Sequence, residues 1–207
     1  MRNMDALLVI INIDLNAELL KCPERFCSEG RLKKSAAIRN DAVRMQSYAA
    51  ELALSYALSG EKLLPPEYRY EKNGKPVIEG GFISLSHSGR YAVCAYSDCP
   101  VGVDIEVPRR VDPNIAKRVL SEKELEEYRS SADENYLLRK FVMKEAFLKM
   151  TGEGITGGLS GIEERDGEVL RNGRHAGYCV RFGEKEFTGF VVSKENMDYK
   201  ICHPIIS

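Results

Sequence analysis

The hydrophobic and polar positions along the first part of the chain predict a strand followed by a long helix. Residues 6–13 form an apolar run, which is typical of a buried strand. Residues 40–59 place their apolar side chains at helical spacing. Asn40 or Asp41 is a suitable N-cap for this helix, and Gly60 is a suitable stop.

The middle of the chain has the pattern of short strands. Residues 73–76 contain Asn-Gly and predict a turn. Residues 82–86 and 91–96 predict two strands, which we expect to be joined by a loop over 87–90. Residues 101–107 predict a further strand.

The rest of the chain predicts helices and then strands. Asp112 with Pro113 is a helix start, and Ser121 with Glu124 is a capping box for another helix. Residues 133–151 predict a second long helix, which we expect to be capped at Asp133. An antiparallel meander is predicted after it, from three turn signals at Asp166-Gly167, Asn172-Gly173 and Phe182-Gly183.

The order of strand and long helix occurs twice, which suggests two halves. The first pair is the strand near residue 6 with the helix 40–59, and the second is the strand near residue 101 with the helix 133–151. We place the break near Asp98, so the expected halves are residues 1–98 and 99–207.

Composition and charge limit the classes of function that the sequence supports. The chain of 207 residues is 43% hydrophobic and 29% charged, with a formal net charge of −1. Without a basic field, binding to nucleic acid or to a membrane is not expected. The N-terminal apolar run is too short for a signal peptide or a membrane span. We therefore expect a cytoplasmic protein with reduced thiols. The six cysteines include no C-x-x-C pair and there are three histidines, so we expect no zinc site.

One strand carries two acidic side chains on the same face. In Val101-Gly-Val-Asp-Ile-Glu106, alternation points Asp104 and Glu106 the same way, and Gly102 permits close approach of a backbone or ligand. Two such carboxylates are suitable ligands for a hard cation such as Mg²⁺. A solvated acidic face is the alternative.

The second long helix also combines charges with an apolar surface. Phe141, Glu145 and Lys149 share a face at i, i+4 and i+8. An ordinary solvated Glu–Lys pair is one interpretation. The helix is apolar nearly all round, however, which indicates burial, and a buried charge needs a partner or a metal.

Other candidate residues lie upstream. Ser86-His87-Ser88 lacks a Gly-x-Ser-x-Gly elbow and an obvious acidic partner, so a Ser-His hydrolase is not favoured. His87 suits either a phosphate contact or a local hydrogen bond in a turn. Candidate phosphate contacts among the basic residues, each of which also fits a solvated surface, are Arg31, Lys33, Lys34, Arg39, Arg44 and Lys75.

Four motifs, in this order, resemble those of the 4′-phosphopantetheinyl transferases of the larger, two-halved type. Residues 74–76 resemble the G-K-P turn, and 84–89 the S-H-S loop. Residues 101–106 resemble G-(I/V)-D-(I/L)-E, and 141–149 resemble W-x-x-K-E-(A/S)-x-x-K, with Phe141 in place of the family's Trp. The last two motifs at this separation are specific. The C-terminal 55 residues carry no motif of this family.

The resemblance implies a fold and a reaction. The fold is α+β, with two similar α/β halves forming a pseudo-dimer, each a small antiparallel sheet on a long helix, and the active site between them. The reaction is Mg²⁺-dependent transfer of the 4′-phosphopantetheine arm of coenzyme A to a serine of an acyl or peptidyl carrier protein. Adenosine 3′,5′-bisphosphate is released, and we expect a monomeric enzyme of secondary metabolism.

The resemblance also implies roles for individual residues. The implied metal ligands are Asp104, Glu106 and Glu145. The implied catalytic residues are Glu145 and Lys149. The implied coenzyme A contacts are Arg44, Lys75, Ser86, His87 and Lys149.

Two other functions stay open. A catalytically idle module that binds coenzyme A or a carrier is one, and a Mg²⁺-dependent pyrophosphate hydrolase is the other. The sequence names neither the physiological carrier nor the choice between Mg²⁺ and Mn²⁺. It assigns no role to the basic segment Arg31, Lys33 and Lys34.

Overall fold

The chain folds into two compact units. The structure is a computed structural model that describes residues 5–154, 158–183 and 185–206. Unit 1 comprises residues 1–98 with 197–207, and unit 2 comprises 99–196. The break thus lies between Asp98 and Cys99, but the segment from Met197 onward belongs to unit 1, whereas the expected second half extended to residue 207.

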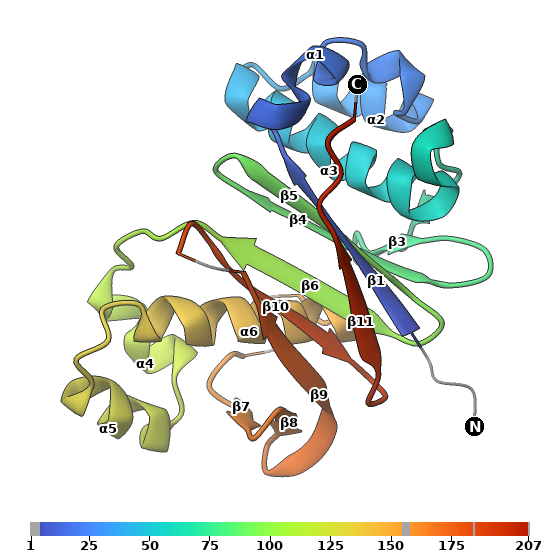
Figure 1. Ribbon diagram of the computed structural model, residues 1–207. Helices are drawn as coiled ribbons and strands as arrows, with labels where there is room; N and C mark the ends of the chain where they lie inside the picture. Colours follow the sequence, from blue (N-terminus) through green and yellow to red (C-terminus); the bar gives the residue numbers. More distant parts are fainter. Residues whose placement is uncertain (1–4, 155–157, 184, 207) are drawn as a thin grey trace. The chain divides into compact units, whose positions relative to one another are not determined.

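Unit 1 is built on a four-stranded sheet with the order β11-β1-β5-β4. Strand β1 pairs antiparallel with β5 and parallel with β11, so this sheet is mixed rather than antiparallel as expected. The returning C-terminal strand causes the difference, because it runs in the same direction as β1 (Figure 1). The four strands are β1 (Asp5–Asn12), β4 (Phe82–Ser88), β5 (Tyr91–Ser97) and β11 (Asp198–Cys202).

The long helix of unit 1 covers this sheet. Helix α3 (Asp41–Ser59) packs on β1 and β5, and Asn40 caps it by accepting a 3.2 Å hydrogen bond from the Val43 amide. The predicted helix 40–59 is therefore confirmed. The polar segment before it also forms helical structure. The remaining elements of unit 1 are α1 (Ala17–Leu20), α2 (Glu29–Ala36), the 3₁₀ helices Asp14–Asn16, Pro23–Arg25 and Gly60–Lys62, and the short strands β2 (Arg69–Tyr70) and β3 (Pro76–Val77).

Strands β4 and β5 form a tighter hairpin than the sequence predicts. Pairing continues to Ser88 and Tyr91, so only Gly89 and Arg90 form the turn. Gly89 has φ of 55°, a value that glycine adopts without strain. His87 consequently lies within a strand and not in the expected loop 87–90.

Unit 2 contains a five-stranded antiparallel sheet with the order β6-β10-β9-β8-β7. The predicted strand 101–107 is present as β6. The predicted meander is present as the four strands β7 to β10. The bounds of the five strands are β6 (Val101–Glu106), β7 (Ile162–Arg165), β8 (Glu168–Arg171), β9 (Arg174–Phe182) and β10 (Thr188–Ser193).

The helices of unit 2 follow β6. The predicted capping box is confirmed at α5, where Ser121 and Glu124 bond each other's backbone amides. The second long helix starts later than predicted, because the Asp133 carboxylate accepts from the Asn135 amide in the preceding turn and caps no helix. The helical segments are the 3₁₀ helix Pro113–Ile115, α4 (Ala116–Val119), α5 (Glu122–Ser130) and α6 (Tyr136–Thr151).

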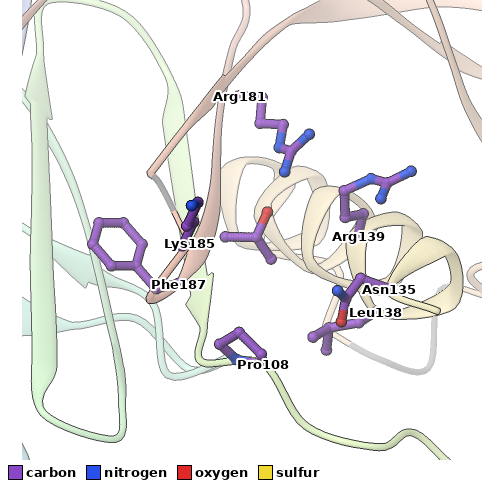
Figure 2. Close-up of a pocket in the computed structure, with 8 residues that line it drawn as sticks. Pro108, Asn135, Leu138, Arg139, Arg181, Lys185 and Phe187 are labelled. Atoms are coloured by element: carbon purple, nitrogen blue, oxygen red, sulfur yellow. The ribbon is translucent and has the colours of Figure 1, made fainter. Parts of the chain in front are cut away.

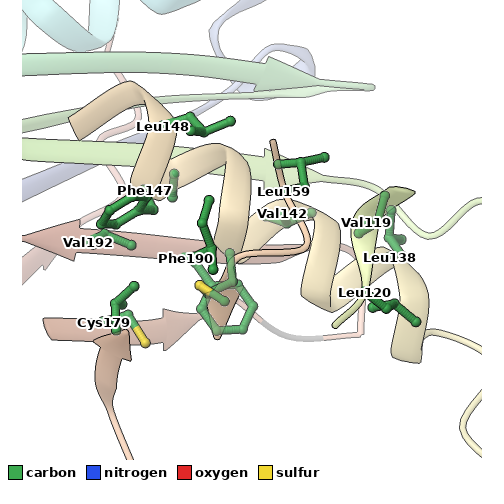
Figure 3. Close-up of a cluster of buried hydrophobic side chains, with 14 of the residues drawn as sticks. Val119, Leu120, Leu138, Val142, Phe147, Leu148, Leu159, Cys179, Phe190 and Val192 are labelled. Atoms are coloured by element: carbon green, nitrogen blue, oxygen red, sulfur yellow. The ribbon is translucent and has the colours of Figure 1, made fainter. Parts of the chain in front are cut away.

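Helix α6 packs very closely on β6 and β10. A Cβ atom on Gly102 of β6 would lie 2.0 Å from the Ala146 carbonyl oxygen and 2.3 Å from the Met150 amide nitrogen, both in α6. The helix therefore rests directly on the backbone of the strand. Figure 3 shows the apolar side of this contact, with Phe147 of α6 near Val192 of β10.

Within the described ranges, no helix has both the length and the apolar character that crossing a bilayer requires.

The contact at Gly102 gives a first prediction. Gly102→Ala forces the backbones of α6 and β6 apart, so it should lower the free energy of unfolding by about 1–3 kcal/mol, as overpacking does. Urea denaturation followed by circular dichroism measures this loss.

The matched control for this prediction is Gly30→Ala in α2, where a Cβ atom meets nothing within 4 Å. This control should leave stability unchanged or raise it by up to about 1 kcal/mol. Equal effects of the two substitutions would contradict the close approach at Gly102.

Candidate active site

The close contact between β6 and α6 brings Asp104 and Lys149 together. Asp104 lies one alternation beyond Gly102 on the same face of β6, and Lys149 is adjacent to Met150, which contacts Gly102. The Lys149 Nζ donates a 2.7 Å hydrogen bond to Asp104 Oδ1. The carboxylate is nearly buried, with 10% of its side chain exposed, whereas the lysine is 32% exposed. The pair is thus open to solvent on the lysine side.

Glu145 adds a second carboxylate to this pair. Its Oε1 is buried and has no hydrogen-bond partner among the described residues. Burial raises the pKa of Glu145, the Asp104 charge raises it further, and Lys149 acts in the opposite direction. The three side chains therefore interact electrostatically, and Glu145 is held in a state that favours proton uptake.

Glu106 lies on the same face of β6 but has a different partner. Its carboxylate accepts a 3.0 Å hydrogen bond from Arg109, and Thr188 of β10 lies directly opposite it in the sheet. In the part of the chain that the structure describes, no group of three or more His, Cys, Asp or Glu side chains is arranged to hold a metal ion. The structure thus couples Asp104 of β6 electrostatically with Glu145 of α6. Glu106 lies two residues beyond Asp104 on the same strand.

The donor set nevertheless fits a hard divalent cation. Carboxylate oxygens are the ligands that Mg²⁺ prefers. The buried Oε1 of Glu145 lacks a partner, and a second carboxylate with the same sign of charge lies near it. A bound cation would remove both the unsatisfied acceptor and the repulsion between Glu145 and Asp104.

Lys144, the neighbour of Glu145, is held in the interior of unit 2. Its side chain is fully buried, and Nζ donates to Glu124 Oε2 at 2.5 Å and to the Val119 carbonyl at 2.7 Å. Burial lowers the pKa of Lys144, and Glu124 opposes this shift. Lys140 lies 3.4 Å from the other Glu124 oxygen. Lys144 therefore fixes α4 and α5 to α6. In the sequence, only the apolar residues around the helix indicated that Lys144 is buried.

The four upstream candidates lie in unit 1. Ser86 and His87 are neighbours on β4, where Ser86 is buried and His87 is exposed. Arg44 of α3 donates to the Ile38 carbonyl at 2.9 Å and to Asp41 at 2.5 Å. Lys75 lies in the turn before β3, and burial lowers its pKa. His87 and Lys75 are thus placed on surface elements, whereas Arg44 also braces the start of its helix.

The basic segment 31–34 is partly structural. Arg31 Nε donates to Glu51 at 3.0 Å, and Glu51 also accepts from Ser28 Oγ at 2.7 Å and from the Tyr68 hydroxyl at 2.9 Å. Glu51 is fully buried in α3. This network was missed by sequence reasoning, because its members are far apart in the chain. Lys34 lies 5.1 Å from the centre of the Tyr70 ring.

Comparisons with known proteins point to one family. Residues 100–202 match the family model of the 4′-phosphopantetheinyl transferase superfamily. The chain is 40% identical over 135 residues to the 4′-phosphopantetheinyl transferase psf-1 of Bacillus pumilus, covering 60% of this chain and 57% of that protein. It is 31% identical over 124 residues to the transferase Sfp of Bacillus subtilis, covering 57% and 55%. The chain therefore spans little more than half the length of these relatives.

A weaker likeness is found among solved structures. The holo-[acyl-carrier-protein] synthase of Thermotoga maritima has a TM-score of 0.38 and 21% sequence identity, with 47% of this chain and 64% of that chain covered.

The buried lysine leads to a second prediction. Lys144→Met leaves the Glu124 carboxylate buried without its main partner, so it should cost about 3–5 kcal/mol of stability. The double variant Lys144→Met/Glu124→Gln removes both charges and keeps an acceptor for the Ser121 amide, so it should regain most of that loss. Urea denaturation of both variants tests the pair.

Lys149→Met in the same helix is the matched control for this prediction. Lys149 is about a third exposed, so water can replace it beside Asp104, and we expect a smaller loss than for Lys144→Met. A double variant no more stable than Lys144→Met would show that the ion pair is not what stabilises this junction.

Proposed function

We propose that the chain belongs to the 4′-phosphopantetheinyl transferase superfamily, whose family model residues 100–202 match. We propose further that it transfers the 4′-phosphopantetheine arm of coenzyme A to a serine of an acyl or peptidyl carrier protein. The observation that carries this proposal is the cluster of Asp104, Glu145 and Lys149. All three lie within the matched residues, and they combine a candidate base, a candidate cation ligand and a positive charge for phosphate.

The proposed reaction exchanges one bond to phosphorus for another. The carrier serine oxygen attacks the β-phosphorus of coenzyme A, and the bond from that phosphorus to the bridging oxygen breaks. Adenosine 3′,5′-bisphosphate leaves, and the serine proton passes to a base. Catalysis of such a transfer consists mainly of positioning and of neutralising charge on the phosphate oxygens.

Glu145 is the residue that we assign as base. Its carboxylate is buried at Oε1 and lies in the electrostatic field of Asp104 and Lys149, so it is placed to take the serine proton directly or through a water. Lys149 contributes a compact positive charge to the transferring phosphate. Because Lys149 now bonds Asp104, that contact must weaken or be shared when a phosphate binds.

A divalent cation completes the assignment. Asp104, Glu106 and Glu145 would hold Mg²⁺, which supplies charge neutralisation at a pyrophosphate when bound. The other proposed roles belong to unit 1, where Arg44, Lys75, Ser86 and His87 would bind coenzyme A, with His87 and Arg44 acting chiefly on phosphates. The relation of the two units as similar pseudo-dimeric halves, the monomeric state, the cytoplasmic location and the link to secondary metabolism stay predictions.

Mass spectrometry of a carrier protein tests the transfer. With coenzyme A and Mg²⁺, the carrier should gain the mass of the phosphopantetheine arm, and Glu145→Gln or a chelator should abolish the gain. Cleavage of coenzyme A without modification of any carrier would favour a pyrophosphate hydrolase. Binding without either reaction would favour the idle module.

A further prediction concerns His87. If the imidazole contacts the 3′-phosphate, His87→Ala loses a charge-assisted hydrogen bond of roughly 1.5–3 kcal/mol, so coenzyme A should bind about tenfold to a hundredfold more weakly. Binding of 3′-dephospho-coenzyme A should change much less, since its partner group is already missing. Calorimetric titration of both ligands with both proteins completes a double-mutant cycle. Equal losses of affinity for the two ligands would show that His87 does not contact the 3′-phosphate.

A further inference from the structure

A cavity of about 510 Å³ lies in unit 2 at the start of helix α6. It is formed by Pro108 after β6, by the start of α6, and by residues of β9 and β10 with Lys185 and Phe187 before β10 (Figure 2). The residues that line it are Pro108, Asn135, Leu138, Arg139, Arg181, Lys185, Phe187 and Thr188. None of these residues belongs to the set of candidate catalytic and binding residues described above.

The lining of this cavity is positively charged. Arg139, Arg181 and Lys185 contribute three cations, and the other described residues of the lining carry no charge. Arg139 forms an ion pair with Asp133. Arg181 also interacts electrostatically with the Asp133 carboxylate, so this one acidic group faces both guanidinium groups. Figure 2 shows the Arg139 and Arg181 side chains on the same side of the cavity, beside the start of α6. Two guanidinium groups so placed favour an anion with several oxygens.

Thr188 is an independent sign of a missing ligand. The residue is only 7% exposed, and its Oγ1 is buried without a hydrogen-bond partner among the described residues. A buried hydroxyl without a partner is costly, so such groups are normally satisfied. Thr188 also lines the cavity, so a rotation of its side chain would let the buried Oγ1 donate to a ligand there.

The start of α6 supplies a third feature. The N-cap residue Asn135 lines the cavity and makes no side-chain capping hydrogen bond. The helix has 16 residues, so its N-terminus carries the positive end of a substantial dipole. Helix N-termini bind phosphate groups, and here the Asp133 carboxylate already accepts from the Asn135 amide, so the helix start attracts an anion.

From these features we propose that the cavity binds a phosphate group, either as the free anion or as the monoester of a small molecule. Guanidinium groups and a hydroxyl donor match the oxygens of a phosphate. Pro108, Leu138 and Phe187 give the cavity an apolar wall against which an organic group can pack, and its volume lies in the range of small-molecule sites. This is a second anion site, beyond the proposed transfer site.

The cavity is separate from Glu145 and Lys149 along the helix. Asn135 precedes Glu145 by ten residues in α6, which corresponds to about 15 Å of helix. Thr188, in contrast, lies opposite Glu106 in the sheet. The experiment must therefore separate binding in the cavity from binding at the transfer site.

The test is a titration of the full chain followed by two-dimensional ¹H–¹⁵N NMR, without added divalent metal and at constant ionic strength. The probes are inorganic phosphate and ribose 5-phosphate. Both should shift the amide signals of Asn135, Leu138 and Thr188 in a saturable manner. Tighter binding of ribose 5-phosphate identifies a phosphate ester as the ligand, and equal binding identifies free phosphate.

Variants locate the site. Arg181→Gln should weaken binding about tenfold or more, as loss of a charge-assisted bond does, and Thr188→Val should weaken it several-fold. Lys123→Gln in α5 makes the same change of charge at an exposed position, and it should have no effect. Lys149→Ala should also leave binding intact. If Thr188→Val does not fold, Arg181→Gln still decides, because its side chain is exposed.

Three outcomes would overturn the proposal. One is the absence of saturable shifts at these amides with either probe. The second is binding that Lys149→Ala or Lys123→Gln weakens as much as Arg181→Gln does, which would place the phosphate elsewhere or make the effect one of general charge. The third is acetate binding as tightly as phosphate, which would remove the preference for a phosphate group.

Discussion

The close approach of helix α6 to strand β6 is the constraint on which the candidate site depends. A glycine at position 102 is the condition for it, because a Cβ atom there would meet the helix backbone at 2.0 Å. Only at this separation does Lys149 reach Asp104 at 2.7 Å and Glu145 experience the Asp104 charge. The geometry of the candidate chemistry is therefore set by a backbone contact, not by the charged residues themselves.

Two lysines of α6 show how burial separates structural from chemical roles. Lys144 is fully buried, and its ammonium group bonds Glu124 and the Val119 carbonyl, so it is not available to a ligand. Lys149, five positions later, keeps about a third of its side chain exposed beside Asp104. Both lie in the segment 141–149, which resembles a motif of the transferase family. Removing one partner of a buried ion pair strongly destabilises a protein, so Lys144 has a structural role. Lys149 is partly exposed and can exchange Asp104 for a ligand.

Much of the local structure could be predicted from the sequence, because it depends on neighbouring residues. The helix capped by Asn40 and the capping box of Ser121 with Glu124 follow from contacts three residues apart. The shared face of Asp104 and Glu106 follows from strand alternation. Predictions also failed at two boundaries within the local structure. The start of α6 at Tyr136 and the extension of β4 through His87 depended on local alternatives that the pattern could not rank.

The sequence by itself determined which residue types are available for chemistry and on which elements they lie. The tertiary structure alone decided which of them interact. In the sequence, Arg31 is one of several basic residues. The structure distinguishes it, because the buried Glu51, twenty positions away, accepts its hydrogen bond. The C-terminal strand joined β1 of unit 1 rather than the meander that precedes it. Thr188, Arg139 and Arg181 meet around one cavity from separate elements. The physical reason is that burial and pairing depend on distances in space, which hydrophobic periodicity along the chain does not specify.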